Sequence, residues 1–106
     1  MITLEDFSKM DLRIATIKAV EPHPNANKLL VLKVDMGGEE RQLVAGIKTH
    51  YTSEELVGKQ IVVVANLQPA KLRGVESQGM LLAAADGGKV IILSPEKPVS
   101  PGSQVK

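Results

Sequence analysis

The sequence contains no cysteine and no tryptophan, and it has one phenylalanine and one tyrosine. Without cysteine the chain forms no disulfide bond, no thiolate metal site and no thiol nucleophile. No apolar run approaches the roughly 20 residues that a membrane-spanning helix requires. The start of the chain carries Glu5 and Asp6, where a secretory signal would carry cations and a long apolar stretch. These absences predict a soluble, cytoplasmic protein with no membrane partner.

Catalytic motifs are also missing. His23 and His50 have no acid or second ligand near them in the sequence, and His23 lies between two prolines, where we interpret it as a turn residue. No serine has the sharp strand-to-helix context of a hydrolase nucleophile, and no glycine-rich phosphate-binding motif occurs. An acidic cluster at Asp35, Glu39 and Glu40 is interpreted as a solvated hairpin edge. We therefore predict no catalytic residue, no metal site, no cofactor and no enzyme activity.

Length and charge set the scale of the molecule. A chain of 106 residues with 43% hydrophobic content is sufficient for one domain, residues 1–106. We expect an N-terminal helical segment in residues 1–11 and a Pro-rich C-terminal extension in residues 94–106. Thirteen cations and twelve anions give a net charge of +1, so any anion-binding site must come from local arrangement.

Short apolar runs separated by turn residues predict an all-β fold. The expected strands are residues 12–20, 28–36, 41–47, 60–67, 79–85 and 89–93. Thr3 and Thr52 each precede an acidic residue by three positions, which predicts capping boxes for short helices near the N-terminus and between the third and fourth strands. This order favours an OB-fold, a five-stranded Greek-key barrel with extra terminal elements. Other small barrels and sandwiches share the periodicity and stay open as alternatives.

Cations gather where acids are missing. The segment 57–74 contains Lys59, Lys71 and Arg73 and no acid, and Lys28 opens the second expected strand. If the barrel closes as predicted, the loops before the second and fifth strands meet on one side. Such a basic strip can hold a phosphate backbone despite a nearly neutral whole. The alternative is an ordinary scatter of surface cations.

The scarcity of aromatic residues narrows the kind of nucleic acid. OB-folds that bind generic single strands stack the bases on exposed aromatic side chains, and here Phe7 and Tyr51 are the only candidates besides histidine. Recognition by shape, through phosphate and 2′-hydroxyl contacts, remains possible. On strand phase alone, Met80 is predicted to be a core residue.

Several motifs follow one another in a specific order: D-L-R at 11–13, K-L-L at 28–30, V-A-G-I at 44–47, Y-T-S-E-E-L-V-G-K at 51–59, V-A-N-L-Q-P-A-K at 64–71 and S-Q-G-M at 77–80. With them, nearly the whole chain resembles the structure-specific tRNA-binding domain. That family includes small free-standing bacterial tRNA-binding proteins, the C-terminal domain of many methionyl-tRNA synthetases, and relatives of endothelial monocyte-activating polypeptide II.

The resemblance implies an OB-fold, a homodimer formed through elements outside the barrel, and binding of tRNA by its shape rather than by its amino-acid identity. It also implies an aminoacyl-tRNA synthetase as a possible partner, and a surface position for Met80. The tRNA-binding residues that it implies are Lys28, Asn66, Lys71, Arg73, Ser77 and Met80. One departure is Asn27, where the family often has an acid before the lysine.

Two alternatives stay open. The chain could be the excised C-terminal tRNA-binding and dimerisation domain of a methionyl-tRNA synthetase, although an initiating Met1 favours a free-standing protein. It could also be a chaperone-like protein-binding module on the same barrel. The related export chaperones lack the S-Q-G-M pattern, so its presence at 77–80 argues against that branch.

Overall fold

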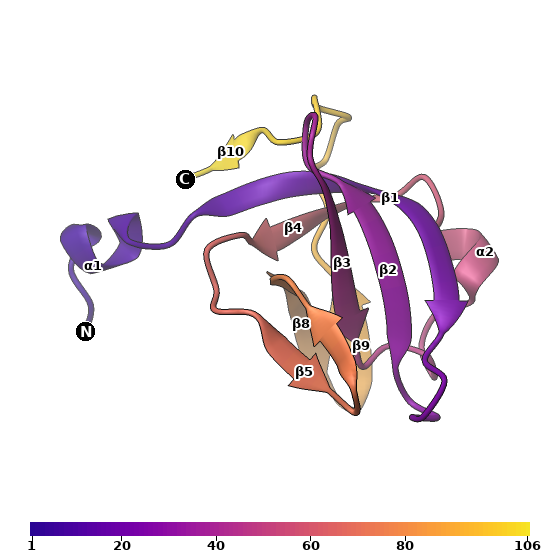
Figure 1. The fold of residues 1–106 in the computed structure, drawn as a ribbon. Helices are drawn as coiled ribbons and strands as arrows, with labels where there is room; N and C mark the ends of the chain where they lie inside the picture. The colour runs from indigo at the N-terminus through magenta and orange to yellow at the C-terminus, as the bar shows by residue number, and fades with distance from the viewer.

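A computed structural model describes residues 1–106, which form two short helices and ten strands. Six antiparallel strands make the main sheet; five follow the order β3-β2-β1-β4-β7, and the short C-terminal β10 (Gln104–Val105) also pairs with β1 (Figure 1). The bounds of the five are Leu12–Pro22 for β1, Leu30–Asp35 for β2, Glu40–Ala45 for β3, Gln60–Val64 for β4 and Met80–Leu81 for β7. Neither helix is long and apolar enough to cross a membrane.

Strand β1 is the long element around which the barrel bends. Its first half, from Leu12 to Thr16, pairs with β4, and its second half, to Pro22, pairs with β2. The register shifts between Ile17 and Ala19, close to the point where the strand changes partners. Such a bulge increases the local twist and lets one strand serve two parts of a curved sheet.

The barrel closes along a seam between β3 and the segment that contains β6 (Val75–Ser77) and β7. The Gln42 N–H donates to the Gln78 side-chain carbonyl at 2.9 Å, and the Gln78 N–H donates to the Gln42 backbone carbonyl at 2.8 Å. The Val44 N–H donates to the Ser77 hydroxyl at 2.9 Å. Side chains therefore replace part of the ladder that would otherwise join the last strand to β3. With helix α2 (Ser53–Leu56) between β3 and β4, this is the predicted OB-fold.

The core fills the inside of the barrel with aliphatic side chains. Its fully buried members include Ile17, Leu30, Leu32, Leu43, Leu56, Ile61, Val34 and Val63. Leu56 is the buried residue of α2, and this helix begins with the predicted capping box between Thr52 and Glu55. Tyr51 packs against the same core and its hydroxyl accepts the Ile92 N–H at 3.1 Å.

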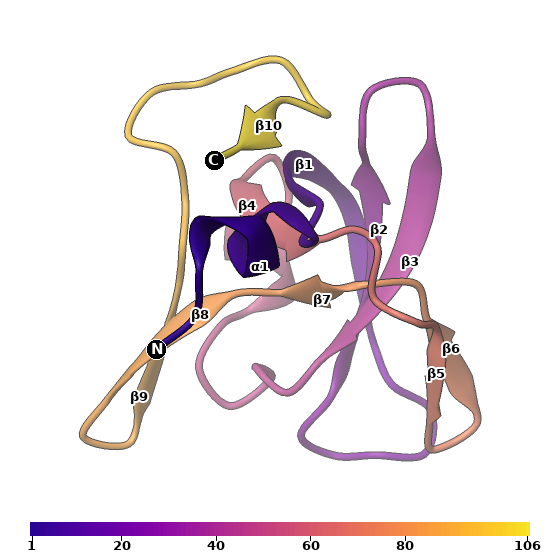
Figure 2. The ribbon, with the colours of Figure 1, turned by 90° about the vertical axis from the view of Figure 1, so that its left-hand side faces the viewer.

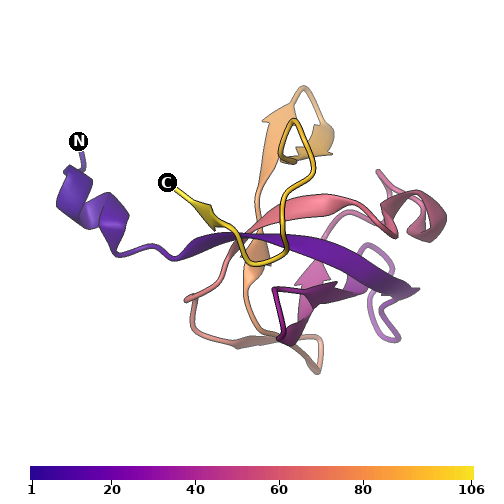
Figure 3. The ribbon, with the colours of Figure 1, turned by 90° about the horizontal axis from the view of Figure 1, so that it is seen from above.

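Helix α1 (Leu4–Ser8) is shorter than the helical segment predicted from the sequence and stands away from the barrel (Figures 1 and 3). Its capping box between Thr3 and Asp6 is present, and it buries none of its residues. The Asn66 side chain anchors the segment that follows, since its carbonyl accepts the Asp11 N–H at 2.9 Å and its amide donates to the Lys9 carbonyl at 2.7 Å.

Two hairpins leave the barrel on different sides. Strand β5 (Ala70–Leu72) pairs with β6, and β8 (Ala83–Asp86) pairs with β9 (Lys89–Ile92). Figure 2 shows the two hairpins at opposite lower corners of the molecule. The strand expected at 79–85 is interrupted at Leu82, and the segment expected to be a loop before it contains the β5–β6 hairpin.

The C-terminal extension returns across the barrel and ends in β10 (Gln104–Val105), which pairs with β1 at Leu12 and Arg13. Upstream of β10, the Gln60 side chain pairs with the backbone of the extension as a neighbouring strand would. Its amide donates to the Val99 carbonyl at 2.7 Å and its carbonyl accepts the Val99 N–H at 3.0 Å. A single side chain thus fixes the middle of the extension to β4.

Candidate nucleic-acid interface

The loop between β1 and β2 meets the β5–β6 hairpin, as the sequence predicted for the loops before the second and fifth strands. His23 makes the contact: its Nε2 lies 2.8 Å from the Leu72 carbonyl oxygen, and its Nδ1 accepts the Asn25 N–H at 2.9 Å. The His23 side chain is buried, at 5% exposure. The interpretation of His23 as a turn residue therefore misses its second role, which depends on a partner far away in the sequence.

Two of the predicted RNA-binding cations come together at this contact. Lys28 and Arg73 line one open hollow of about 440 Å³, with Ala26, Asn27 and Leu29 as its other lining residues. We call this hollow, defined by these five residues, the cationic notch. No acidic side chain lines it, so the charges of Lys28 and Arg73 are not neutralised by a carboxylate within the notch.

Arg73 occupies an unusual backbone conformation. With Gly74 it forms the two-residue turn between the paired Leu72 and Val75, and its φ is +54°. This left-handed region suits glycine, asparagine and aspartate, which are the usual residues of such tight hairpin turns. Arg73 is the one residue other than glycine with a positive φ in this structure.

Two other predicted site residues, Lys71 and Asn66, do not line the notch. Lys71 is exposed on β5, directly opposite Glu76 on β6, so part of its charge faces an acid. Asn66 is exposed but has its amide engaged with the backbone near α1. The structure therefore groups Lys28, Arg73 and Lys71 around one hairpin and places Asn66 in an anchoring position.

Ser77 is buried rather than on the surface, and the tRNA-binding role that the resemblance implies for it stays a prediction. The residue is 5% exposed; its hydroxyl accepts the Val44 N–H and donates to the Gly79 carbonyl at 2.8 Å. Gly79 has φ +138°, and a Cβ there would lie 3.0 Å from the Val64 carbonyl oxygen. These two residues of the S-Q-G-M motif build the seam.

Met80, the last residue of that motif, is 46% exposed and lies on β7, where it pairs with Val64. The surface position implied by the resemblance is confirmed, and the core position predicted from strand phase is wrong. Met80 does not line the cationic notch. It is instead presented beside the seam that Ser77 and Gly79 hold.

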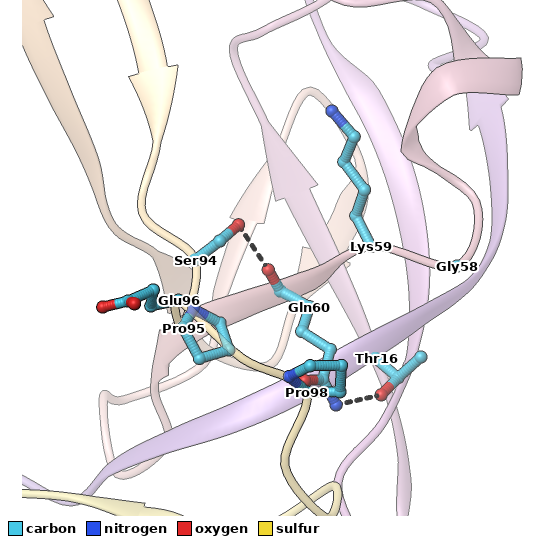
Figure 4. A pocket seen from close by; sticks show the side chains of 8 residues that line it. All are labelled: Thr16, Gly58, Lys59, Gln60, Ser94, Pro95, Glu96 and Pro98. Atoms are coloured by element: carbon cyan, nitrogen blue, oxygen red, sulfur yellow. Dashed lines mark hydrogen bonds between the residues drawn. The ribbon is translucent and has the colours of Figure 1, made fainter.

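Cations also line two further hollows. Arg41, with a side chain 24% exposed, donates to the Ala65 carbonyl and forms an ion pair with Glu39 at 3.2 Å. The largest hollow, about 510 Å³, lies over the Gln60 anchor and is lined by Lys59 and Glu96 among others (Figure 4). None of the predicted RNA-binding residues lines it.

The barrel belongs to the OB class, whose members include many oligonucleotide-binding modules. The family model described as "Putative tRNA binding domain" matches residues 12–104. A methionine–tRNA ligase from Pyrococcus furiosus is 60% identical over 105 residues, which is 99% of this chain and 14% of the ligase. For the ligase from Thermotoga maritima, the identity is 59% over 104 residues, or 98% of this chain and 16% of the ligase.

Solved structures of similar size resemble the whole chain. The MetRS related protein from Pyrococcus horikoshii has a TM-score of 0.94 and 38% identity, covering 100% of this chain and 98% of its own. The chaperone CsaA from Bacillus anthracis has a TM-score of 0.92 and 32% identity, covering 100% and 99%. The chain belongs to the tRNA-binding domain family, and it is homologous to the C-terminal domain of methionyl-tRNA synthetase.

Proposed function

We propose that this domain binds tRNA by its shape and backbone, through the face formed by the β1–β2 loop and the β5–β6 hairpin. The observation that carries the proposal is the notch shared by Lys28 and Arg73, with Lys71 on the same hairpin. Cations gathered in this way neutralise backbone phosphates and release counterions, which supplies affinity without reading sequence. Met80 adds an exposed apolar contact for a sugar or base.

Recognition by shape is favoured over base stacking because the chain offers no row of exposed rings on the barrel. Phe7 lies on helix α1, which stands away from the barrel (Figure 1). The Tyr51 hydroxyl bonds to the backbone of Ile92, and the Lys59 ammonium lies 5.5 Å from the centre of the Tyr51 ring. A single ring with these contacts is no platform for a run of stacked bases. The protein should therefore prefer folded tRNA to an unstructured strand of equal length.

The proposal is tested by charge reversal. Lys28→Glu and Lys71→Glu should each lower tRNA affinity at least about tenfold and reduce the salt dependence, because a phosphate contact is lost. The matched control is Lys89→Glu, which changes the charge equally at an exposed position on the β8–β9 hairpin, across the barrel from the β5–β6 hairpin (Figure 2). Fluorescence anisotropy at several salt concentrations measures the effect. Equal loss in all three variants would indicate a general charge effect and contradict a localised face.

We further propose that the functional unit is a homodimer assembled partly through the N-terminal segment and the extension. Ile2 and Leu4 are 71% and 83% exposed, and Val99 in the extension is 39% exposed. Pairing would cover such apolar side chains and present a doubled binding face to one tRNA. Sedimentation should give a dimer at micromolar concentration. A monomer under those conditions would contradict this part of the proposal.

The link to a synthetase follows from homology. The chain spans 14% of the Pyrococcus furiosus ligase, so we propose that it adds tRNA affinity to a methionyl-tRNA synthetase, either as an appended domain or as a separate protein in the cytoplasm. It would contribute no active site of its own. The CsaA likeness at 32% identity supports a second candidate, a chaperone-like protein-binding module. Competition between tRNA and an unfolded polypeptide separates the two.

A further inference from the structure

We propose that the cationic notch is a site for a single backbone phosphate and that His23 positions Arg73 within it. This inference rests on the proposed tRNA-binding function and deepens it. It assigns a role to a buried histidine that was not among the predicted site residues. His23 is treated as a positioning residue, because its ring nitrogens contact protein backbone and not the notch itself.

The hydrogen bonds of His23 fix its chemical form. The backbone N–H of Asn25 can only donate, so Nδ1 must accept; the Leu72 carbonyl can only accept, so Nε2 must donate. The neutral ring with its proton on Nε2 satisfies both bonds at once. One side chain thus closes the local turn that leads to Lys28 and also holds the tip of the β5–β6 hairpin.

The bond to Leu72 acts directly on Arg73. The carbonyl of Leu72 and the N–H of Arg73 belong to the same planar peptide group. The φ angle of Arg73 is the rotation about its N–Cα bond, measured from this peptide plane. A hydrogen bond from His23 that holds the plane therefore restrains the positive φ of Arg73. A residue in this sparsely populated region persists where its surroundings determine it. His23 supplies that restraint from the loop that carries Lys28, and so couples the two sides of the notch.

The lining of the notch fits a phosphate group. Lys28 offers a compact ammonium and Arg73 a planar fork of donors, which together can share one tetrahedral anion. The remaining lining residues are uncharged, and the acid of the hairpin, Glu76, faces Lys71 instead. A phosphate in the notch would contact two elements at once. Its affinity would then depend on how firmly those elements are held together.

The decisive test is a double-mutant cycle measured on tRNA binding. Lys28→Gln and Arg73→Gln should each lower affinity about tenfold, and the double variant should lose only about 30-fold because the two cations share one group. Lys71 lies outside the notch, so Lys28→Gln with Lys71→Gln should lose the full product, about 100-fold. If the wild-type protein binds tRNA but the losses from Lys28→Gln and Arg73→Gln are additive, the shared phosphate site in the notch is contradicted. The proposed tRNA-binding function would still stand.

Two substitutions of His23 test whether its two hydrogen bonds matter or only its packing. Asparagine can keep the bond to the Asn25 N–H as an Asx-turn but has no donor that reaches Leu72. Glutamine places an amide donor near the position of Nε2. We expect His23→Asn to lower affinity about fivefold and to abolish the Lys28–Arg73 coupling, while His23→Gln stays within about twofold of the wild type. Wild-type affinity for His23→Asn, or equal losses for both variants, would overturn the positioning role.

A second measurement needs no variant and no tRNA. Inorganic phosphate titrated into the wild-type protein should shift the NMR signals of the Arg73 side chain and the Lys28 amide together, ahead of those of other surface cations. Shifts spread evenly over the lysines would overturn the notch. If phosphate shifted the notch signals while tRNA failed to bind, the proposed function would fall and the phosphate site would stand.

Discussion

Replacing Ser77 by alanine tests how the barrel is closed. The hydroxyl accepts the Val44 N–H at 2.9 Å and donates to the Gly79 carbonyl at 2.8 Å, and Ser77 is 5% exposed. Removal leaves two buried backbone groups without partners. Each such group costs about 1–3 kcal/mol, so the free energy of unfolding should fall by about 2–6 kcal/mol. For a domain of this size that corresponds to a decrease in melting temperature of roughly 8–24 °C.

Urea unfolding followed by circular dichroism, at one fixed protein concentration, measures this change. The matched control is Ser94→Ala, because the exposed Ser94 hydroxyl also donates to a backbone carbonyl, that of Gln60 at 2.7 Å. Water can replace that bond, so the control should stay within about 0.5 kcal/mol of the wild type. A Ser77→Ala variant as stable as this control would refute the hydroxyl's role in the seam. Loss of tRNA affinity at unchanged stability would instead support direct contact with RNA.

Two further predictions concern other parts of the fold. Gln60→Ala removes both hydrogen bonds to Val99, so hydrogen exchange of the Val99 amide should accelerate at least about tenfold. Exchange of the Val63 amide, in the core of the barrel, should stay slow. Unchanged exchange at Val99 would contradict the anchoring role of Gln60. Hydrogen bonds from the Thr52 backbone and then its hydroxyl hold the pKa of Glu55 below its ordinary value, so the cap of α2 is complete above that ordinary value and is lost as pH falls through the lowered pKa. Thr52→Ala keeps the backbone donor and removes the hydroxyl donor, so it should raise the pKa of Glu55 in an NMR titration. An unchanged value would contradict the contribution assigned to the hydroxyl.

The barrel strands and both capping boxes could be predicted because their signals are local. Apolar residues at short spacing mark β1 to β4, and a threonine three positions before an acid marks each helix start. The β5–β6 hairpin was missed because β5 is exposed throughout and its turn begins with Arg73, a residue that does not indicate a tight turn. The pairing of β5 with β6 is therefore visible in the folded structure but not in the sequence pattern.

The roles of His23 and Ser77 depend on contacts that no local pattern contains. His23 bonds to Leu72 and Ser77 bonds to Val44, each more than thirty residues away in the sequence. Flanking prolines made His23 typical of a turn, and the motif placed Ser77 next to a surface methionine. Sequence therefore identified the neighbourhood of the candidate site but could not distinguish side chains that face solvent from those that hold the site in place.

The seam also affects whether strands of other molecules can pair with the edge of β3. The outward-facing amides of β3 at Gln42 and Val44 are occupied by the side-chain oxygens of Gln78 and Ser77. An unpaired strand edge is a template on which other chains can stack, and natural sheets avoid leaving one free. The side chains of Gln78 and Ser77 thereby occupy two donors at the rim of the sheet, so the bonds that close the barrel also leave these donors unavailable to a strand from another molecule.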